Sequence, residues 1–490
     1  MPSPVDIPFR SFIDIDRNAA TPIFLQIVNQ LIKAIQHNRI PPNAKLPGTR
    51  QLSQLLNVHR NTVVSSYDEL AAQGWLIIRP NQGAFVISSI PTSRAKVHAQ
   101  SHYPKETGFS FKRSILLDNP YDFGDYTYVF NDGTPDIRLT QINDLSRVYS
   151  AAMKRKMNRK KMGYYNHEGS EYFKEQLAHY IHLSRGLNIT PSNLLITRSS
   201  EMSLFIISEI LLRAGDIVAI GSPGYFSANM IFQKNRALLY VIPVDQEGID
   251  TDALRRLCEK QKVRMVYITP QHHYPTTVSL SAPRRMALLQ LADRYGFAIV
   301  EEDHDYDFHY DKQPLLPLAT ADTGGMVVYV GSFGKSLAPG FRTGFIVAPD
   351  NLMQEMRKHL GIIDRQGDVL MEHALGEMIE EGVIHRHLKR SLKIYKERRN
   401  KIINLLDGKC SSWLSAEKPS GGLAVWATFH SPINLAKLAQ HSAENQLFIP
   451  RNILYQQKGL TAMRIGFGHM NEEELEQSLR LFCETIKQLG

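Results

Sequence analysis

Short runs of β-branched and other apolar residues recur through the second half of the chain, separated by longer helical patterns. The runs are Leu194–Thr197, Ile217–Ile220, Leu239–Ile242, Met265–Thr269, Ala298–Val300 and Val327–Val330. The helical patterns between them include residues 201–212, 251–260 and 282–295. This alternation predicts an α/β fold with a mainly parallel sheet and helices on both faces. Because ligands of such sheets bind at the carboxyl ends of the strands, we expect the chemistry in the loops that follow these runs.

The chain is long enough for more than one compact unit. It has 490 residues, of which 43% are hydrophobic and 21% are charged, as in ordinary globular proteins. Residues 91–113 have little apolar periodicity and contain Pro, Ser, Thr, Gly and His, so they are predicted to be a linker. The predicted domains are therefore residues 1–90 and 114–490.

The cysteines and the N-terminus indicate the compartment. Cys258, Cys410 and Cys483 are odd in number, far apart and in no CxxC spacing, so neither a disulfide framework nor a zinc site is expected. The N-terminus carries acids and prolines where a signal peptide would be basic and then apolar. No apolar run reaches the roughly 18 residues of a membrane span. A soluble, cytoplasmic protein with no membrane partner is predicted.

Three helices and a β-hairpin are predicted in the N-terminal segment. Apolar residues at helical spacing predict the helices, and a Gly-containing turn between two apolar runs predicts the hairpin. In order, these elements are expected at about residues 22–37, 49–56, 60–73, 75–79 and 84–87. Thr49 is expected to cap the second helix, because its hydroxyl can accept a hydrogen bond from a free backbone N–H.

The second and third of these helices have the pattern of a DNA reader. Two short helices joined by a tight turn, the second with a polar N-terminal end, can enter a major groove. Arg50 and Arg60 are candidates for contacts to phosphates or bases. Secondary candidates are His59, Asn61 and Thr62, with Gly83 in the hairpin. A helical docking domain with a solvated basic face fits equally well, and the net charge of +9 permits DNA binding without establishing it.

A lysine-containing loop follows the last of the apolar runs. Lys335 lies among small residues and is followed seven positions later by Arg342. This arrangement suits an anionic cofactor that bears an aldehyde, with Lys335 forming a Schiff base and Ser332 and Arg342 binding a phosphate. A nucleotide phosphate loop is excluded because its glycine and four-residue interval are missing before Gly334-Lys335-Ser336. An exposed structural lysine is the plainer alternative.

An acidic cluster follows the run Ala298–Val300. Pyridoxal phosphate needs a carboxylate to keep its pyridine nitrogen protonated, and Glu302 or Asp303 could supply it. His304 could approach the phenolic oxygen of the cofactor. A metal site is disfavoured because adjacent strand residues point to opposite faces, so few of these side chains could converge on one ion.

Three further clusters follow other strands. Residues 197–202 form a strand-to-helix turn whose backbone N–H groups could hold a phosphate, with Ser200 and Glu201 at its end. Tyr225 offers an aromatic ring, and His272 lies in the loop 269–277. Each cluster alone is more often structural than functional.

Two resemblances decide between these alternatives. Residues 21–87 resemble the winged helix-turn-helix of GntR-type bacterial regulators, most specifically in Leu-Pro-Gly-Thr-Arg at 46–50 and Val-His-Arg-Asn-Thr-Val at 58–63. The resemblance implies sequence-specific binding to double-stranded DNA through Arg50 and Arg60. Residues 120–488 resemble fold-type I pyridoxal-phosphate aminotransferases, through the clusters above taken in order.

The whole chain is similar to MocR/GabR-type regulators, which join these two parts. The resemblance implies that Lys335 is the Schiff-base lysine, that Arg342 and the Ser200 turn bind phosphate, and that Tyr225 stacks on the cofactor ring. It implies that Arg464 grips an effector carboxylate, since a guanidinium can make a bidentate fork. It also implies a homodimer. The expected function is a transcription regulator that senses an amino compound or pyridoxal phosphate; the alternative is an active aminotransferase with an accessory DNA-binding domain.

The chain departs from the family pattern near the cofactor. Residues 301–304 read Glu-Glu-Asp-His where the family has Glu-Asp-Asp-Tyr, and Thr277 stands where a glycine closes the proline loop. These departures predict weak transaminase activity at most. Residues 154–161 form the densest basic run, which is either a solvated helix end or a second surface that faces DNA.

Overall fold

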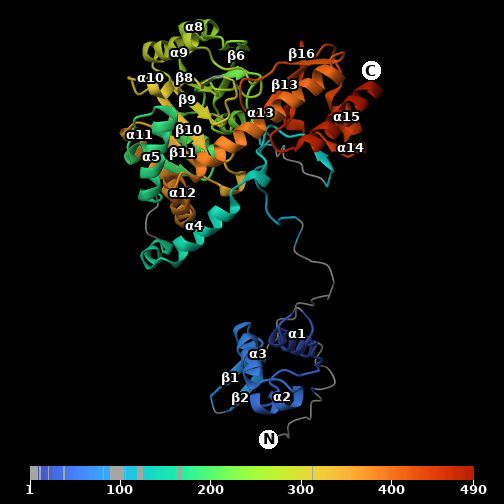
Figure 1. The fold of residues 1–490 in the computed structure, drawn as a ribbon. Helices are drawn as coiled ribbons and strands as arrows, with labels where there is room; N and C mark the ends of the chain where they lie inside the picture. Colours follow the sequence, from blue (N-terminus) through green and yellow to red (C-terminus); the bar gives the residue numbers. More distant parts are fainter. Residues whose placement is uncertain are drawn as a thin grey trace. The chain divides into compact units, whose positions relative to one another are not determined.

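The computed structural model describes residues 9, 13–19, 21–36, 39–80, 82–88, 104, 106–117, 125–163, 168–311 and 313–489. The chain splits into two compact units, Met1–Phe111 and Lys112–Gly490, each considered by itself (Figure 1). Most of the predicted linker, residues 91–103 and 105, lies outside the described residues. Among the helices that are described, none has both the length and the apolar character needed to cross a membrane.

The N-terminal unit contains the predicted helices and hairpin. Its elements are α1 (Ile23–Gln36), α2 (Thr49–Leu56), α3 (Arg60–Ala72), β1 (Leu76–Arg79) and β2 (Gly83–Val86). The two strands pair antiparallel, with Leu76 opposite Val86. A single apolar core holds these elements together, since Ile27, Leu52 and Val63 from the three helices are fully buried in one cluster.

The cap of α2 differs from the prediction. Gly48, not Thr49, is the N-cap of α2, and it has no side chain to make the capping bond. Thr49 is the first helical residue instead, and its hydroxyl accepts a hydrogen bond from Arg60 Nε at 3.4 Å. In α3 the cap is His59, whose Nδ1 accepts from the backbone N–H of Asn61 at 3.3 Å.

The centre of the second unit is an eight-stranded, mainly parallel sheet, as the alternating runs predicted. Its order is β4-β11-β10-β9-β8-β5-β6-β7. Only β11 and β7 run against their neighbours. The strands are β4 (Leu194–Thr197), β5 (Ile217–Ser222), β6 (Leu238–Asp245), β7 (Gly248–Ile249), β8 (Val263–Ile268), β9 (Ala298–Asp303), β10 (Val327–Ser332) and β11 (Gly344–Val347).

Helices cover both faces of this sheet. One buried cluster joins the strands to α6 (Ser200–Leu211), α7 (Phe226–Lys234) and α11 (Asp350–Ile363). A second cluster joins them to α8 (Thr251–Lys260) and α9 (Ala282–Tyr295). Further helices are α4 (Ile142–Lys154), α5 (Glu171–Arg185), α10 (Leu318–Ala321) and α12 (Val369–Glu380), with 3-10 turns η2 (Ile137–Leu139), η3 (Lys156–Met162), η4 (Pro191–Asn193) and η5 (Pro339–Phe341).

The long helix α13 (Val383–Lys409) leads to a second, antiparallel sheet of order β12-β13-β16-β15 (Figure 1). The strands are β12 (Leu414–Ala416), β13 (Ala424–Phe429), β15 (Leu454–Gln457) and β16 (Leu460–Gly466), with η6 (Arg451–Ile453), α14 (Leu435–Glu444) and α15 (Glu472–Leu489). A short strand, β14 (Leu447–Phe448), pairs in parallel with β3 (Tyr128–Val129) from the start of the unit. The beginning and the end of the unit are therefore joined.

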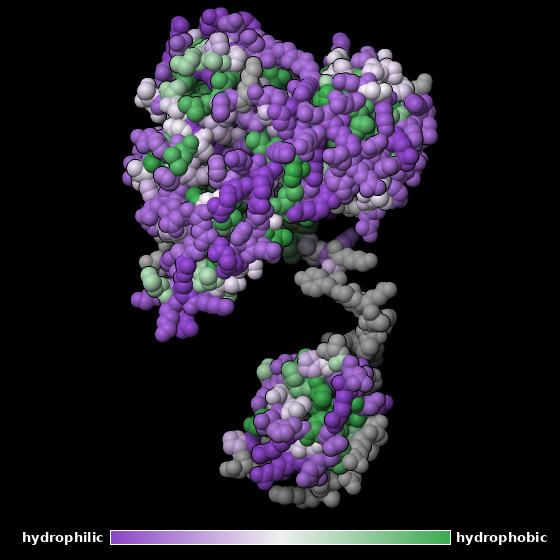
Figure 2. Space-filling model, in the orientation of Figure 1, coloured by the Kyte–Doolittle hydropathy of each residue, from purple (hydrophilic) through white to green (hydrophobic). Residues whose placement is uncertain are grey.

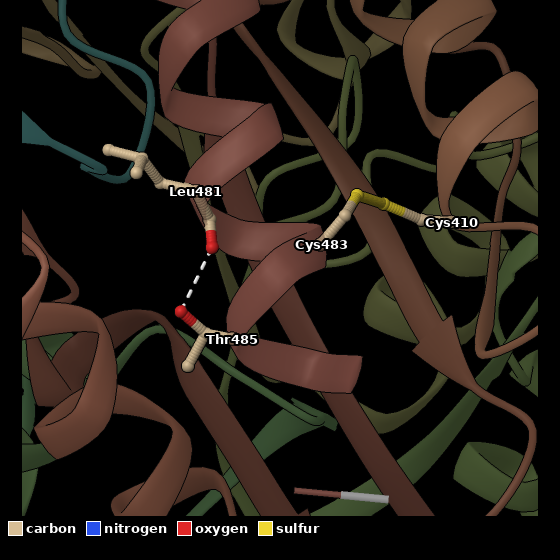
Figure 3. Close-up of a disulfide and its surroundings, with 4 residues drawn as sticks. All are labelled: Cys410, Leu481, Cys483 and Thr485. Carbon is tan, nitrogen blue, oxygen red and sulfur yellow. Dashed lines mark hydrogen bonds between the residues drawn. A yellow bond between two sulfur atoms is a disulfide. The ribbon is translucent and has the colours of Figure 1, made fainter. Parts of the chain in front are cut away.

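The expectation that no disulfide forms was wrong. Cys410, directly after α13, is bonded to Cys483 in α15 (Figure 3). The two cysteines are 73 residues apart in sequence, but the packing of α13 against α15 brings their Cα atoms within 5.9 Å. Both are buried, while Cys258 is free. The sequence spacing carried no sign of this pairing because it depends on tertiary packing.

Candidate functional site

Strand β9 directs alternate carboxylates to opposite faces of the sheet. The sequence predicts the acidic cluster in the loop after the strand. The strand instead extends to Asp303, so Glu301, Glu302 and Asp303 lie within it. Glu301 accepts hydrogen bonds from the backbone N–H groups of Leu318 and Ala319 and so holds the start of α10. These alternating directions follow from the two-residue period of a strand.

Glu302 and Asp303 have different partners. Asp303 contacts the Tyr329 hydroxyl and Arg185, whose Nε lies 3.2 Å from Oδ2. Glu302 accepts a hydrogen bond from the Tyr267 hydroxyl on the neighbouring strand β8. The Ser200 hydroxyl also bonds to Glu302, and burial raises the pKa of this carboxyl to about 7. Glu302 therefore faces the loop side where Ser200 and Lys335 lie, whereas Asp303 is engaged in a separate buried ion pair.

Lys335 lies in the loop that follows β10, and its side chain is mostly buried. Its Nζ is 3.7 Å from Oδ2 of Asp305. Burial lowers the pKa of Lys335, and Asp305 opposes that shift. A lysine with a lowered pKa has a larger share of the neutral amine, which is the form that attacks an aldehyde.

Asp305 and two histidines form a buried cluster beside this lysine. His272 Nδ1 is 2.9 Å from Asp305 Oδ1, and His304 Nε2 is 3.7 Å from Oδ2. Burial and the nearby Lys335 lower the pKa of His304 to about 3, so this ring is neutral at physiological pH. Burial opposes the ionisation of Asp305, but His304, His272 and Lys335 hold its pKa well below the ordinary value.

Arg464 reaches the same region from the antiparallel sheet. It is fully buried on β16, its Nε donates to the Asp132 carbonyl oxygen and its Nη1 to that of Pro275, both at 2.8 Å. Its guanidinium lies over the Tyr274 ring, 4.6 Å from the centroid. Its remaining nitrogen, Nη2, has no hydrogen-bond partner within the described part of the chain.

Other buried polar atoms around Lys335 are also unsatisfied. Within the residues that the structure describes, they are Asp305 Oδ2, His304 Nε2, His272 Nε2 and Arg464 Nη2. Buried polar groups are nearly always hydrogen-bonded, so a cluster of exceptions needs an explanation. A polar ligand held between the two sheets would supply partners for donors and acceptors of this kind.

The other predicted cofactor residues lie on α6, before α7 and at the end of β10. Ser200 begins α6, where Ser199 is the N-cap, and the Tyr225 hydroxyl donates to Glu201 at 3.0 Å. The Tyr225 ring meets that of Tyr274 edge-on, with centroids 4.8 Å apart. Ser332 ends β10.

Arg342 stands apart from this set. It is exposed, with a left-handed backbone at φ 49°, on the wall of a small cavity shared with Thr197, Arg198 and Asp364. The sequence prediction missed Tyr267, Asp305 and Tyr274. Tyr267 alone had a usable signal, because it is the last but one residue of a strand beside β9.

The predicted DNA-contacting residues lie at the start of α2, at the start of α3 and in the hairpin. Arg50, Arg60, His59 and Asn61 are exposed, and Thr62 is half-buried. Gly83 has φ 110°, a backbone conformation that favours glycine, and it begins β2 directly after the turn from β1. Asn81 of this turn lies outside the described residues.

Comparison with known protein families matches both units. Residues 24–86 match the bacterial regulatory proteins of the gntR family, and residues 130–485 match aminotransferase class I and II. Pyridoxal phosphate is the cofactor of the second domain.

Relatives match most of this chain over most of their own length. A probable rhizopine catabolism regulatory protein, MocR of Rhizobium meliloti, is 27% identical over 85% of this chain and 83% of its own. The HTH-type transcriptional regulator TauR of Rhodobacter capsulatus is 27% identical over 86% of this chain and 87% of its own. The regulator YhdI of Bacillus subtilis is 24% identical over 95% of this chain and 96% of its own.

Solved structures match the second unit. A kynurenine aminotransferase of Pyrococcus horikoshii has a TM-score of 0.69 at 25% identity, covering 74% of this chain and 91% of its own. The α-aminoadipate aminotransferase LysN of Thermus thermophilus has the same TM-score at 23% identity, which shows the shared fold. The chain belongs to the aminotransferase class I and II family, and the gntR-type reader in front of that domain makes it a MocR-type transcription regulator.

Proposed function

We propose that this regulator senses a small primary amine at Lys335 and converts its binding into a change of DNA affinity. The observation that carries the proposal is the cluster of unsatisfied buried polar atoms around Lys335, in a chain that also contains a DNA-reading unit. A ligand alters DNA affinity only if it binds two arrangements of the protein unequally. The predicted linker at 91–113 is our candidate for the segment that changes between them.

The residues around Lys335 fit pyridoxal phosphate. When bound, the cofactor supplies an aldehyde that condenses with primary amines. Lys335 is proposed to hold the aldehyde carbon, and Glu302 to hold a proton at the pyridine nitrogen, because Asp303 is already bound to Arg185 and Tyr329. His304, neutral in its buried position, is proposed to donate a hydrogen bond to the phenolic oxygen.

Other residues are proposed to bind the phosphate of the cofactor and the carboxylate of the effector. Ser200 and Ser332 are assigned to the cofactor phosphate, and Tyr225 to its ring. The assignment of Arg342 to the phosphate rests on the family resemblance alone, because its side chain lies on the wall of a neighbouring cavity. Glu201 orients Tyr225 through their hydrogen bond. Arg464 is assigned to an effector carboxylate, since Nη2 remains available after its two backbone contacts.

We also propose a homodimer that binds a two-part operator through Arg50 and Arg60. Support comes from apolar side chains exposed at the start of the second unit and on α4, namely Ile137, Ile142 and Met153. Light scattering that gives the mass of one chain would contradict the dimer.

A gel-shift assay on the DNA upstream of the protein's own gene tests the central proposal. The full chain, loaded with pyridoxal phosphate, is titrated with candidate amino compounds. We expect one of them to change both DNA affinity and the visible absorbance of the cofactor, and Lys335→Ala to lose both responses. Arg60→Ala should weaken binding about tenfold or more while leaving the absorbance intact. An absorbance response without any change in DNA binding, or rapid turnover with an oxo acid, would contradict sensing as the function.

A further inference from the structure

Asp305 is a buried carboxylate, and one of its oxygens accepts no hydrogen bond from the described residues. Its side chain is 2% exposed, and His272 occupies Oδ1 at 2.9 Å. Oδ2 has no hydrogen-bond partner among the described residues, yet it lies 3.7 Å from Lys335 Nζ. A buried carboxylate oxygen without a hydrogen-bond donor is costly, so a cation beside Oδ2 would stabilise it.

The surroundings fix Asp305 in this position. A Cβ at Gly422 would lie 2.9 Å from Oδ2, so the absence of a side chain there makes room for the carboxylate. Gly422 also has φ 76°, a conformation that favours glycine. On the other side, the His272 ring lies 4.9 Å from that of His309, which closes the cluster.

The charged and titratable groups that face Lys335 are Asp305, Arg464, Asp132, Glu302 and His304. Those that face Asp305 are His304, His272 and Lys335. His304 stays neutral, and Glu302 is bound to Tyr267 and Ser200. Among the described residues, the carboxylate that forms an ion pair with Lys335 within 4 Å is Asp305, so Asp305 can balance a positive charge on Lys335 in direct contact.

We propose that Asp305 is the counter-ion of Lys335 and stabilises the lysine ammonium that forms when an amine effector displaces Lys335 from the cofactor. This inference rests on the function proposed above. In that exchange the effector ammonium would first give up one proton, and its free amine would take the aldehyde carbon from Nζ, which already carries one proton. The two protons that the effector nitrogen gives up in all would end on Nζ as its bond to that carbon breaks, so Lys335 would leave as an ammonium. Asp305 would thereby determine the equilibrium between binding of Lys335 and binding of the effector. It would act as a positioning residue, held in place by its contact with His272.

The first test needs neither cofactor nor effector. In the cofactor-free full chain, the pH dependence of Lys335 acylation is followed by mass spectrometry. Asp305→Asn is expected to lower the midpoint by about one pH unit or more, which makes labelling below the midpoint about tenfold faster. Asp305→Glu keeps the charge and should restore most of the wild-type midpoint. Asp311→Asn, which changes an exposed carboxylate, is the matched control and should leave it unchanged.

Equal midpoints in wild type and Asp305→Asn would overturn the proposal. If Asp305→Asn does not fold, carbon NMR of the Asp305 carboxyl in wild type and Lys335→Met decides instead. Removal of the cation should raise the carboxyl pKa, and an unchanged value refutes the pair. In the loaded protein, Asp305→Asn should raise the amine concentration needed for the absorbance change about tenfold. If Asp305→Asn shifts the acylation midpoint but wild type shows no absorbance change with any amine, the Asp305–Lys335 pair is supported and the proposed sensing function is contradicted.

Discussion

At the scale of single residues, the site depends on which way each carboxylate of β9 points. The two-residue period of a strand predicts that few of the acidic side chains could converge on one ion, and Glu302 and Asp303 do bind different partners. It could not reveal whether Glu302 or Asp303 faces Lys335, because that depends on Tyr267 and Arg185, which come from other elements. The family pattern has an aspartate at position 302, and the longer glutamate here keeps the carboxylate.

The raised pKa of Glu302 gives a prediction for stability against pH. A carboxyl that titrates near 4.5 when unfolded and at about 7 when folded binds its proton more tightly in the native state. Its contribution is fully present below pH 4.5 and is lost as pH rises through 7. Glu302→Gln, which has no such proton, should therefore gain about 2 kcal/mol relative to wild type between pH 5 and pH 8.

Urea unfolding of the cofactor-free proteins at the two pH values measures this difference. Asp311→Asn serves as a control. The main influence on the pKa of Asp311 is its hydrogen bond to Arg399, not burial, and this bond lowers the pKa to about 2. If wild type and Glu302→Gln change in parallel with pH, the carboxyl of Glu302 titrates normally and its assignment to the pyridine nitrogen loses support.

At the scale of elements, local patterns predicted the large sheet well and the smaller sheet poorly. The helical patterns at 251–260 and 282–295 coincide with α8 and α9, and the first strand coincides with β4. No strand of the antiparallel sheet was predicted. Arg464 was assigned by resemblance alone, and its contacts with Asp132 and Pro275 join positions 332 and 189 residues apart. Such contacts leave no periodic trace in the sequence.

The disulfide between α13 and α15 should stabilise the second unit. In the chain-entropy account, a bridge between cysteines 73 residues apart is worth about 4 kcal/mol, and measured values are often nearer 2. Cys483→Ala should lower the stability of the oxidised protein by about that amount. Dithiothreitol should have the same effect on wild type and none on the variant. Equal stability of wild type with and without reductant would mean that the bond is not formed in solution.

At the scale of the whole molecule, we propose that the basic run 154–161 is a second surface that faces DNA; the alternative is a solvated helix end. It forms the end of α4 and the turn η3, where Lys154, Lys156, Arg159 and Lys160 are exposed. Figure 2 shows hydrophilic residues over most of the projection that α4 and η3 form. Asn158 departs from the expected solvated helix end, because it is buried and bonds to the Ala152 carbonyl oxygen.

Reversal of these four charges to glutamate tests the surface. If each meets a phosphate, the slope of log affinity against log salt should fall by up to about 4 units, and only on DNA longer than the reader's own site. Lys260→Glu with Lys262→Glu, two exposed lysines elsewhere in the unit, is the matched control. A slope that does not respond on long DNA would favour a merely solvated helix end.

The contact between Arg464 and the Asp132 carbonyl oxygen does not depend on which side chain stands at position 132. Asp132 follows β3, the strand that leads from the linker side of the unit and pairs with β14. Because the acceptor belongs to the main chain, any residue at position 132 that keeps the backbone path preserves the contact. The contact between Arg464 and the segment after β3 is therefore fixed by backbone geometry, and a substitution at position 132 can leave it intact.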